Sequence, residues 1–123
     1  MATPIFAKDA PPAAGPYSHA TKTSTAIYCS GQIHMDNSGA VVDGTIAEKT
    51  ALCVKNIKAV LAEAGSSIDK VVKTTVFLSD MSYFAEMNAE YEKHFSHKPS
   101  RSCVAVKTLP KNADVEIECI ALP

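Results

Sequence analysis

The chain has 123 residues, 46% of them hydrophobic and 20% charged, and a chain of this length buries roughly two thirds of its surface on folding. This composition excludes disordered, collagen-like and disulfide-stapled proteins. Twelve Lys and Arg against thirteen Asp and Glu leave a net charge of −1, which disfavours nucleic acid as the principal partner. We expect one domain over residues 1–123.

No apolar run approaches the roughly 20 residues that cross a bilayer, so no membrane segment is predicted. The first twenty residues lack the pattern of a signal or transit peptide, which favours the cytoplasm and leaves a mitochondrial fraction open. The four cysteines stand among apolar neighbours without a Cys-x-x-Cys pair. This spacing favours reduced, buried thiols over a disulfide or metal framework.

The first half of the chain predicts short strands followed by a helix. Residues 26–31 form a β-prone run that ends at Gly31, and the turn residues 37–39 precede a second short run at 40–42. Thr45 and Glu48 have the spacing of a capping box, and Gly65 provides a stop signal about 19 residues later. Apolar residues three and four apart between them predict a helix with one buried face.

The second half predicts a strand, a helix and two further strands. Residues 71–78 are rich in Val and Thr, and Asp80 or Ser82 can cap a helix that ends before the Lys98-Pro99 step. The pattern predicts strands over residues 102–106 and 115–122, with a turn at 109–112 between them.

This order of elements predicts an α+β fold: a two-layer sandwich with one sheet and both helices on one face. Odd-numbered residues of the last strand are apolar, but Ile120 and Leu122 place apolar groups on its other face as well. A second subunit that covers this face would explain the pattern, so we expect a homo-oligomer.

Arg101 is the first candidate for chemistry, because it is the only arginine beside eleven lysines and begins an apolar strand. A guanidinium can hold a planar carboxylate through two parallel hydrogen bonds, although a surface ion pair is the simpler reading. Glu116 and Glu118 point to the same side of the last strand, where either could act as a general base or belong to a charged strip at the solvent edge.

Further candidates come from turns and from the second helix. Tyr17 follows a rigid Gly-Pro turn, and Ser30-Gly31 would let a ligand approach bare backbone. Asn88 is a polar residue on the apolar stripe of the second helix, where capping a loop is the alternative role. Cys103 is a nucleophile candidate, with a structural thiol as the alternative. The histidines have no metal-ligand spacing, so no metal site is predicted.

Several blocks of the sequence together resemble the reactive intermediate deaminase A family, also called the YjgF/YER057c/UK114 family. The resemblance runs from about residue 5 to the C-terminus. The blocks are 15–20, 30–33, 72–78, Phe84 with Asn88 and Tyr91, 99–104 and 115–118.

The resemblance implies a chorismate-mutase-like subunit with a mixed sheet, assembled as a homotrimer with clefts between subunits. It further implies hydrolysis of 2-imino acids, such as 2-iminobutanoate and 2-iminopropanoate, to 2-oxo acids and ammonia. Such imines are released by pyridoxal-phosphate-dependent dehydratases. No metal or organic cofactor is implied, since imines already hydrolyse in water.

Within this resemblance, Arg101 would clamp the substrate carboxylate and Glu116 would orient or deprotonate the attacking water, with Glu118 as the weaker choice. Tyr17 would bond the substrate or water from the adjacent subunit. The remaining substrate-binding residues would be Ser30, Gly31, Asn88 and Cys103.

Three other functions stay open at this point. One is a redox-regulated holdase, which would need reactive thiols that the pattern of the four cysteines does not indicate. Some relatives with this fold lack the arginine, and a small-ligand-binding regulatory module would need no turnover. A ribonuclease or translation inhibitor is associated with other members of the family, but the net charge and the single arginine offer it little physical support.

Overall fold

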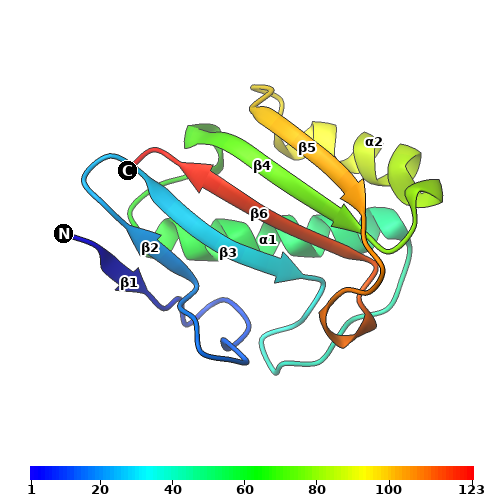
Figure 1. Ribbon diagram of the computed structural model, residues 1–123, viewed down its shortest axis with the longest axis horizontal. Coiled ribbons are helices and arrows are strands. Elements are labelled where there is room, and N and C mark those ends of the chain that lie inside the picture. Colours follow the sequence, from blue (N-terminus) through cyan, green and yellow to red (C-terminus); the bar gives the residue numbers. More distant parts are fainter.

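In the computed structural model, which describes residues 1–123, six strands form one sheet in the order β1-β2-β3-β6-β4-β5 (Figure 1). Neighbouring strands are antiparallel except β4 and β5, which are parallel. The strands are β1 Thr3–Ile5, β2 Ala20–Lys22, β3 Ile27–Ile33, β4 Val71–Leu78, β5 Ser100–Ala105 and β6 Val115–Ala121. The helices are α1 Ile46–Glu63 and α2 Phe84–His94, and both lie on one face of the sheet. The predicted two-layer α+β architecture with a mixed sheet is thus confirmed.

Helix α1 begins and ends as its sequence predicts. The Thr45 hydroxyl accepts a hydrogen bond from the Glu48 N–H at 3.1 Å, and the Glu48 carboxylate accepts one from the Thr45 N–H at 2.9 Å. Gly65, just beyond the helix, has a φ of +80°, which favours glycine. The predicted apolar face packs against the sheet, with Val54, Ile57, Val60 and Leu61 completely buried.

Several boundaries differ from the prediction. Strand β3 covers Ile27–Ile33 instead of 26–31, and β6 ends at Ala121 instead of 122. Asp80 does cap a helical turn, by accepting the Ser82 N–H, but this is a 3-10 turn over Met81–Tyr83, and α2 itself begins at Phe84. The run at 40–42 makes only an isolated bridge between Met35 and Val41, because the Asp36 carboxylate takes N–H groups that a hairpin ladder would use.

Strand β5 covers Ser100–Ala105 instead of 102–106, since its parallel register with β4 begins at Ser100. Strands β1 and β2, three residues each, were not predicted at all. Pairing between neighbours determines these limits, and a local pattern does not carry that information.

The two faces of the sheet differ sharply. The main core lies between the sheet and the helices and includes the inward residues of β6, namely Val115, Ile117, Cys119 and Ala121. On the opposite face, which we call the open face, a small cluster of Ile33, Met35, Leu109 and Ala113 is covered by loops. The rest of the open face has no covering element, and Tyr28 on β3 is half exposed there.

Candidate functional site

A pocket of about 420 Å³ opens on the open face, between the N-terminal loop, β3 and the start of β6. Four of the predicted site residues line this pocket: Tyr17, Ser30, Gly31 and Glu116. The other lining residues are Pro11, Pro12, Ala14, His19, Gln32, Ile33, Met35, Pro110 and Lys111. The pocket therefore joins a loop, two strands and the turn before β6 around one carboxylate.

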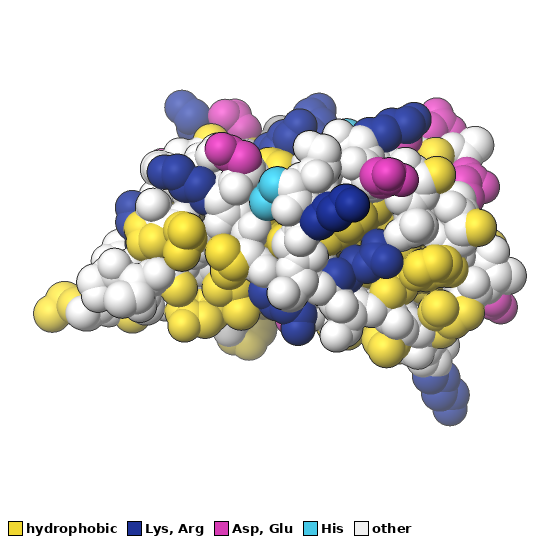
Figure 2. Space-filling view, turned by 90° about the horizontal axis from the view of Figure 1, so that it is seen from above, with side chains coloured by type: hydrophobic (Ala, Val, Ile, Leu, Met, Phe, Trp, Pro, Cys, Tyr) yellow, Lys and Arg dark blue, Asp and Glu magenta, His cyan; other side chains and the backbone are white.

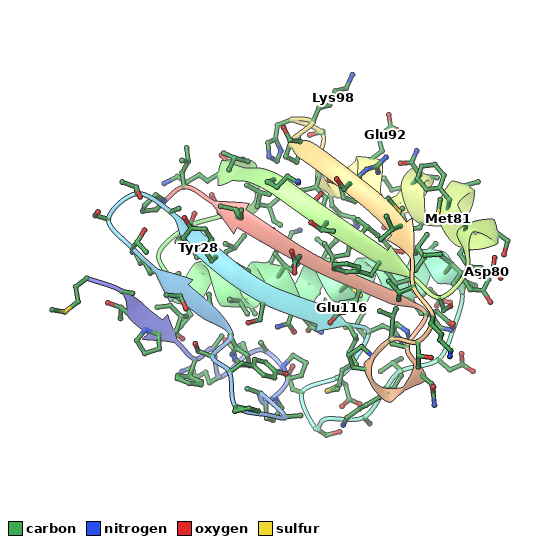
Figure 3. The ribbon with its side chains drawn as sticks, in the orientation of Figure 1. Tyr28, Asp80, Met81, Glu92, Lys98 and Glu116 are labelled. Atoms are coloured by element: carbon green, nitrogen blue, oxygen red, sulfur yellow. The ribbon has the colours of Figure 1, made fainter.

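Glu116 reaches this pocket because side chains alternate along β6. Its neighbours Val115 and Ile117 are completely buried under the helices, so Glu116 stands on the open face, where Figure 3 labels it. The Glu116 carboxylate lies directly over Gly31 of β3. A Cβ on Gly31 would lie only 2.6 Å from Oε2 of Glu116, so this approach requires glycine.

The position of Gly31 follows from an irregularity in β3. The register between β3 and β6 shifts between Cys29 and Gln32, and Ser30 and Gly31 lie within this bulge. A bulge re-aims the strand locally and leaves backbone groups free of regular pairing. The pocket is therefore built where β3 departs from the ladder.

Partial burial raises the pKa of the Glu116 carboxyl, and the nearby negative charge of Glu118 raises it further. Glu118 is exposed and does not line the pocket. A carboxyl group with a raised pKa exchanges protons closer to neutral pH than an ordinary glutamate does. Of the two carboxylates that the sequence left open, Glu116 is the one that lies in the pocket.

The N-terminal loop forms the opposite wall. The Tyr17 phenol accepts a hydrogen bond from the Ala14 N–H at 3.3 Å, and its side chain is 46% exposed toward the pocket mouth. The Ser30 hydroxyl donates a hydrogen bond to the Ser18 carbonyl at 2.8 Å, and this bond links the N-terminal loop to β3. Ser30 consequently supports the wall of the pocket, whereas the Tyr17 O–H keeps its proton for a ligand.

His19 and Lys111 line the pocket although sequence reasoning did not select them. The buried His19 ring fixes the loop, since Nδ1 accepts the Ala7 N–H at 2.9 Å and Nε2 donates to the Pro11 carbonyl at 2.7 Å. His19 follows Tyr17 by two residues, which is a weak signal. Lys111 is placed by a turn with a φ of +54°, which the sequence does not reveal.

The remaining predicted site residues form a second cluster at the edge of the sheet. Arg101 on β5 donates from Nη1 to Oδ1 of Asn88 on α2 at 2.7 Å. Its Cζ lies 4.8 Å from the ring centroid of Tyr91 and 5.5 Å from that of Phe84. A hollow of about 360 Å³ beside Arg101 is lined by Asn88, Tyr91, Glu92, Phe95, Lys98 and Pro99.

Cys103 lies two residues beyond Arg101 and is partly buried. Burial raises the pKa of its thiol, although the positive charge of Arg101 opposes the rise. A thiol with a raised pKa is a poor nucleophile, which supports a structural or backbone role for Cys103. The structure therefore groups Cys103 with Arg101 and Asn88, away from the pocket.

Within one chain the two clusters do not meet. Glu116 lies opposite Phe77 of β4 and Arg101 lies opposite Thr74, so they are two strands apart and three residues apart along the sheet. At the usual strand spacings this corresponds to about 14 Å between Cα atoms. Arg101 faces α2, whereas Glu116 stands on the open face; Figure 3 shows Glu116 far from Glu92 and Lys98, which flank Arg101.

Two further findings concern metals and membranes. Nowhere in the chain do three or more His, Cys, Asp or Glu side chains come together in a group that could hold a metal ion. Neither helix has the length and apolar character that crossing a membrane requires.

The fold and the site define the class of this chain: a small two-layer α+β protein with a pocket around a carboxylate on the open face of its sheet. The profile of the family described as Endoribonuclease L-PSP matches residues 7–123. The chain is 50% identical to "Protein MMF1, mitochondrial" of Saccharomyces cerevisiae over 121 residues. The alignment covers 98% of this chain and 83% of MMF1.

Solved structures agree with this match. The YJGF gene product from E. coli superposes with a TM-score of 0.92 at 37% identity and covers 98% of each chain. E. coli TdcF with bound serine superposes with a TM-score of 0.93 at 34% identity, again over 98% of each chain. The chain therefore belongs to the YjgF/Rid family, as its sequence blocks predict.

Proposed function

We propose that this protein hydrolyses 2-imino acids, such as 2-iminobutanoate and 2-iminopropanoate, to 2-oxo acids and ammonia. The observation that carries the proposal is that most N–H donors of the Arg101 guanidinium have no hydrogen-bond partner in the chain. This guanidinium donates one hydrogen bond, to Asn88, and its Cζ lies over the rings of Tyr91 and Phe84 at 4.8 and 5.5 Å. The remaining N–H donors are free for a planar anion, and a carboxylate is the group that a guanidinium fork fits best.

Glu116 accepts and donates the protons in this mechanism. Water attacks C2 of the protonated imine while Glu116 takes one of its protons, which gives a neutral amino alcohol beside the carboxylate. The protonated Glu116 then passes this proton to the amine nitrogen. Ammonia leaves as the C2 hydroxyl becomes the carbonyl of the 2-oxo acid, and Glu116 takes the released proton for transfer to solvent or ammonia. The raised pKa of Glu116 suits both halves of this cycle.

Because Arg101 and Glu116 are far apart in one chain, the proposal requires two copies. We propose a homotrimer in which β5 and α2 of one subunit bring Arg101, Cys103 and Asn88 to the pocket of the next. The open face supports such an assembly: Tyr28 and Leu122 are each about half exposed near half-buried Ile120, and Val104 is about half exposed on β5. Exposed apolar groups of this kind are typical of a surface that a partner covers.

The relatives add chemical support. The E. coli TdcF structure holds serine, an amino acid whose carboxylate is next to a carbon that bears nitrogen, as in a 2-imino acid. The name of MMF1 places that protein in mitochondria. For this chain we propose the cytoplasm or the mitochondrion as the compartment.

The test couples a threonine dehydratase to the protein and follows the formation of 2-oxobutanoate while semicarbazide competes for the imine. Wild-type protein should outpace the trap, and Arg101→Ala should not. If the wild type does not accelerate the reaction, the enzyme proposal is wrong for this substrate. Tight 2-oxobutanoate binding without turnover would then support a ligand-binding regulatory module.

The description of the matching family names a ribonuclease, but the surface charge of this chain gives that function less support. Nucleic-acid surfaces gather Lys and Arg into a patch or stripe. On the face shown in Figure 2, basic and acidic side chains are interspersed, and the net charge of the chain is −1. RNA cleavage that survives in Arg101→Ala would indicate another surface or a contaminant.

A further inference from the structure

Arg101 is held by three side chains of one helix face. Phe84, Asn88 and Tyr91 follow one another at spacings of four and three along α2, so all three point toward β5. Asn88 fixes one end of the guanidinium at 2.7 Å, and Cζ of the guanidinium lies over the rings of Tyr91 and Phe84. Tyr91 makes the closer contact, at 4.8 Å, and its ring therefore limits how far the guanidinium can move.

Tyr91 is itself fixed by the neighbouring strand. Its hydroxyl lies 2.7 Å from Oγ1 of Thr74 on β4, and its ring stacks on Phe95 with the centroids 4.5 Å apart. Tyr91 is 6% exposed and Thr74 is completely buried, so this hydrogen bond is shielded from water. Burial raises the pKa of the Tyr91 phenol, with the hydrogen bond to Thr74 and the charge of Arg101 opposing the rise.

Thr74 also lies beside Arg101 in the sheet, because the register of the parallel strands pairs these two residues directly. Arg101, Thr74 and Tyr91 therefore contact one another pairwise. The Arg101 backbone pairs with that of Thr74, the Thr74 hydroxyl is hydrogen-bonded to the Tyr91 hydroxyl, and the Tyr91 ring contacts the Arg101 guanidinium. Displacement of any member would disturb the other two.

Packing alone does not require a hydroxyl at position 74. The other inward residues of β4 are Val71, Val76 and Leu78, all apolar and buried. Valine has the shape of threonine and would avoid the cost of burying a polar group. The hydroxyl at this position therefore points to a role beyond filling the core.

We infer that the Thr74–Tyr91 pair is a positioning element that sets the orientation of the Arg101 guanidinium for carboxylate binding. This inference rests on the proposed function for its ligand. Thr74 is completely buried and does not line the hollow beside Arg101, and the Tyr91 hydroxyl, directed to Thr74, is likewise turned away from a ligand. Thr74 and Tyr91 therefore act through Arg101.

The test uses Thr74→Val, Thr74→Ser and Tyr91→Phe, with calorimetry of 2-oxobutanoate binding and kcat/KM for 2-iminobutanoate. Loss of the hydroxyl pair should weaken binding about fivefold in Thr74→Val and in Tyr91→Phe. The Thr74→Val, Tyr91→Phe double variant should lose no more than either single variant. Thr74→Ser keeps the hydroxyl and should bind like wild type, whereas a packing role predicts that Ser is worse than Val.

Arg101 also provides a readout that does not depend on activity. As the only arginine, it gives a single Nε–H signal in a protein labelled with ¹⁵N-arginine. This signal should stay sharp in wild type and Thr74→Ser, and should shift or broaden in Thr74→Val and Tyr91→Phe. The control is Thr50→Val, which removes a buried hydroxyl whose bond to the Ile46 carbonyl lies within α1.

The outcomes separate the two proposals. If the Arg101 signal responds as described but wild type neither binds 2-oxobutanoate nor hydrolyses the imine, the positioning role stands and the proposed function falls. If the Arg101 signal and the affinity are unchanged in Thr74→Val and Tyr91→Phe, or if Thr50→Val matches them, the positioning role is wrong.

Discussion

The Glu116 carboxylate lies so close over Gly31 that a Cβ at position 31 would stand 2.6 Å from Oε2 and 2.8 Å from Cδ. Real Cβ atoms do not approach that closely, so any side chain at position 31 must displace the carboxylate. Gly31 is therefore needed for the position of Glu116 and not for an unusual backbone conformation, since its φ is not positive.

Gly31→Ala should lower kcat of imine hydrolysis at least about tenfold, because the general base moves from its position. Steady-state kinetics and thermal unfolding measured together check this. Gly39→Ala is the matched control: Gly39 has a φ of +89° with open space around it, so alanine should cost about 1 kcal/mol of stability but no activity. Equal activity in Gly31→Ala and wild type would contradict the placement of Glu116.

Glu118→Gln should shift the acid limb of the pH–rate profile to lower pH. Activity requires ionised Glu116, and the negative charge of Glu118 helps to raise the pKa of Glu116. Removal of that charge lets Glu116 ionise at lower pH, so the variant should keep its plateau rate and gain activity on the acid side. An acid limb that does not move in a pH profile of kcat/KM would show that Glu116 is not the titrating base.

Stability should respond to Glu116 in the opposite sense to an ordinary carboxylate. Its pKa is raised in the folded state, so its contribution is most favourable below the unfolded pKa and is lost as pH rises through the folded value. Glu116→Gln should therefore be more stable than wild type at pH 7 and lose this advantage in acid. Urea unfolding at both pH values checks the sign, and a variant less stable than wild type at pH 7 would contradict it.

Local patterns predicted much of this molecule correctly. The cap at Thr45, the alternation along β6 and the strand over 71–78 all follow from neighbouring residues. The bulge that carries Gly31 depends on register with β6, a contact between distant segments. The separation of Arg101 from Glu116 likewise depends on strand order. Sequence reasoning could therefore select both residues but could not show that they lie in different clusters.

Asp114 anchors a partly buried ionic network that the sequence did not reveal. Its carboxylate accepts hydrogen bonds from Lys49 Nζ at 2.7 Å and from the Ser79 hydroxyl at 2.7 Å. These bonds, that of Lys49 first, lower the pKa of Asp114. Its contribution to stability is therefore present above the unfolded pKa, which is about 3.9 for an aspartate, and is lost as pH falls through the folded value.

Asp114→Asn should lower the free energy of unfolding at pH 7 by about 2 kcal/mol, because Lys49 is left buried without its main partner. The loss should shrink at pH 3, where wild type begins to lose the same interaction. Urea titrations at the two pH values measure both effects. Asp43→Asn is the control, since Asp43 also contacts Lys49, at 3.3 Å, but is almost completely exposed and should matter little. A similar loss in both variants would contradict the role of burial.

The proposed site between subunits makes a prediction that a site within one chain cannot satisfy. Arg101→Ala and Glu116→Gln should each be nearly inactive alone. If trimers are dissociated, mixed in equal amounts and reassembled, each cleft draws its arginine and its glutamate from different subunits. Both residues are then intact in roughly a quarter of the clefts, so about a quarter of wild-type activity should return. The control mixes Arg101→Ala with an Arg101→Ala, Glu116→Gln double variant, which can form no complete cleft. Activity that stays at the level of this control, in a sample that mass spectrometry shows to contain mixed oligomers, would place the reaction within single chains and overturn the shared cleft.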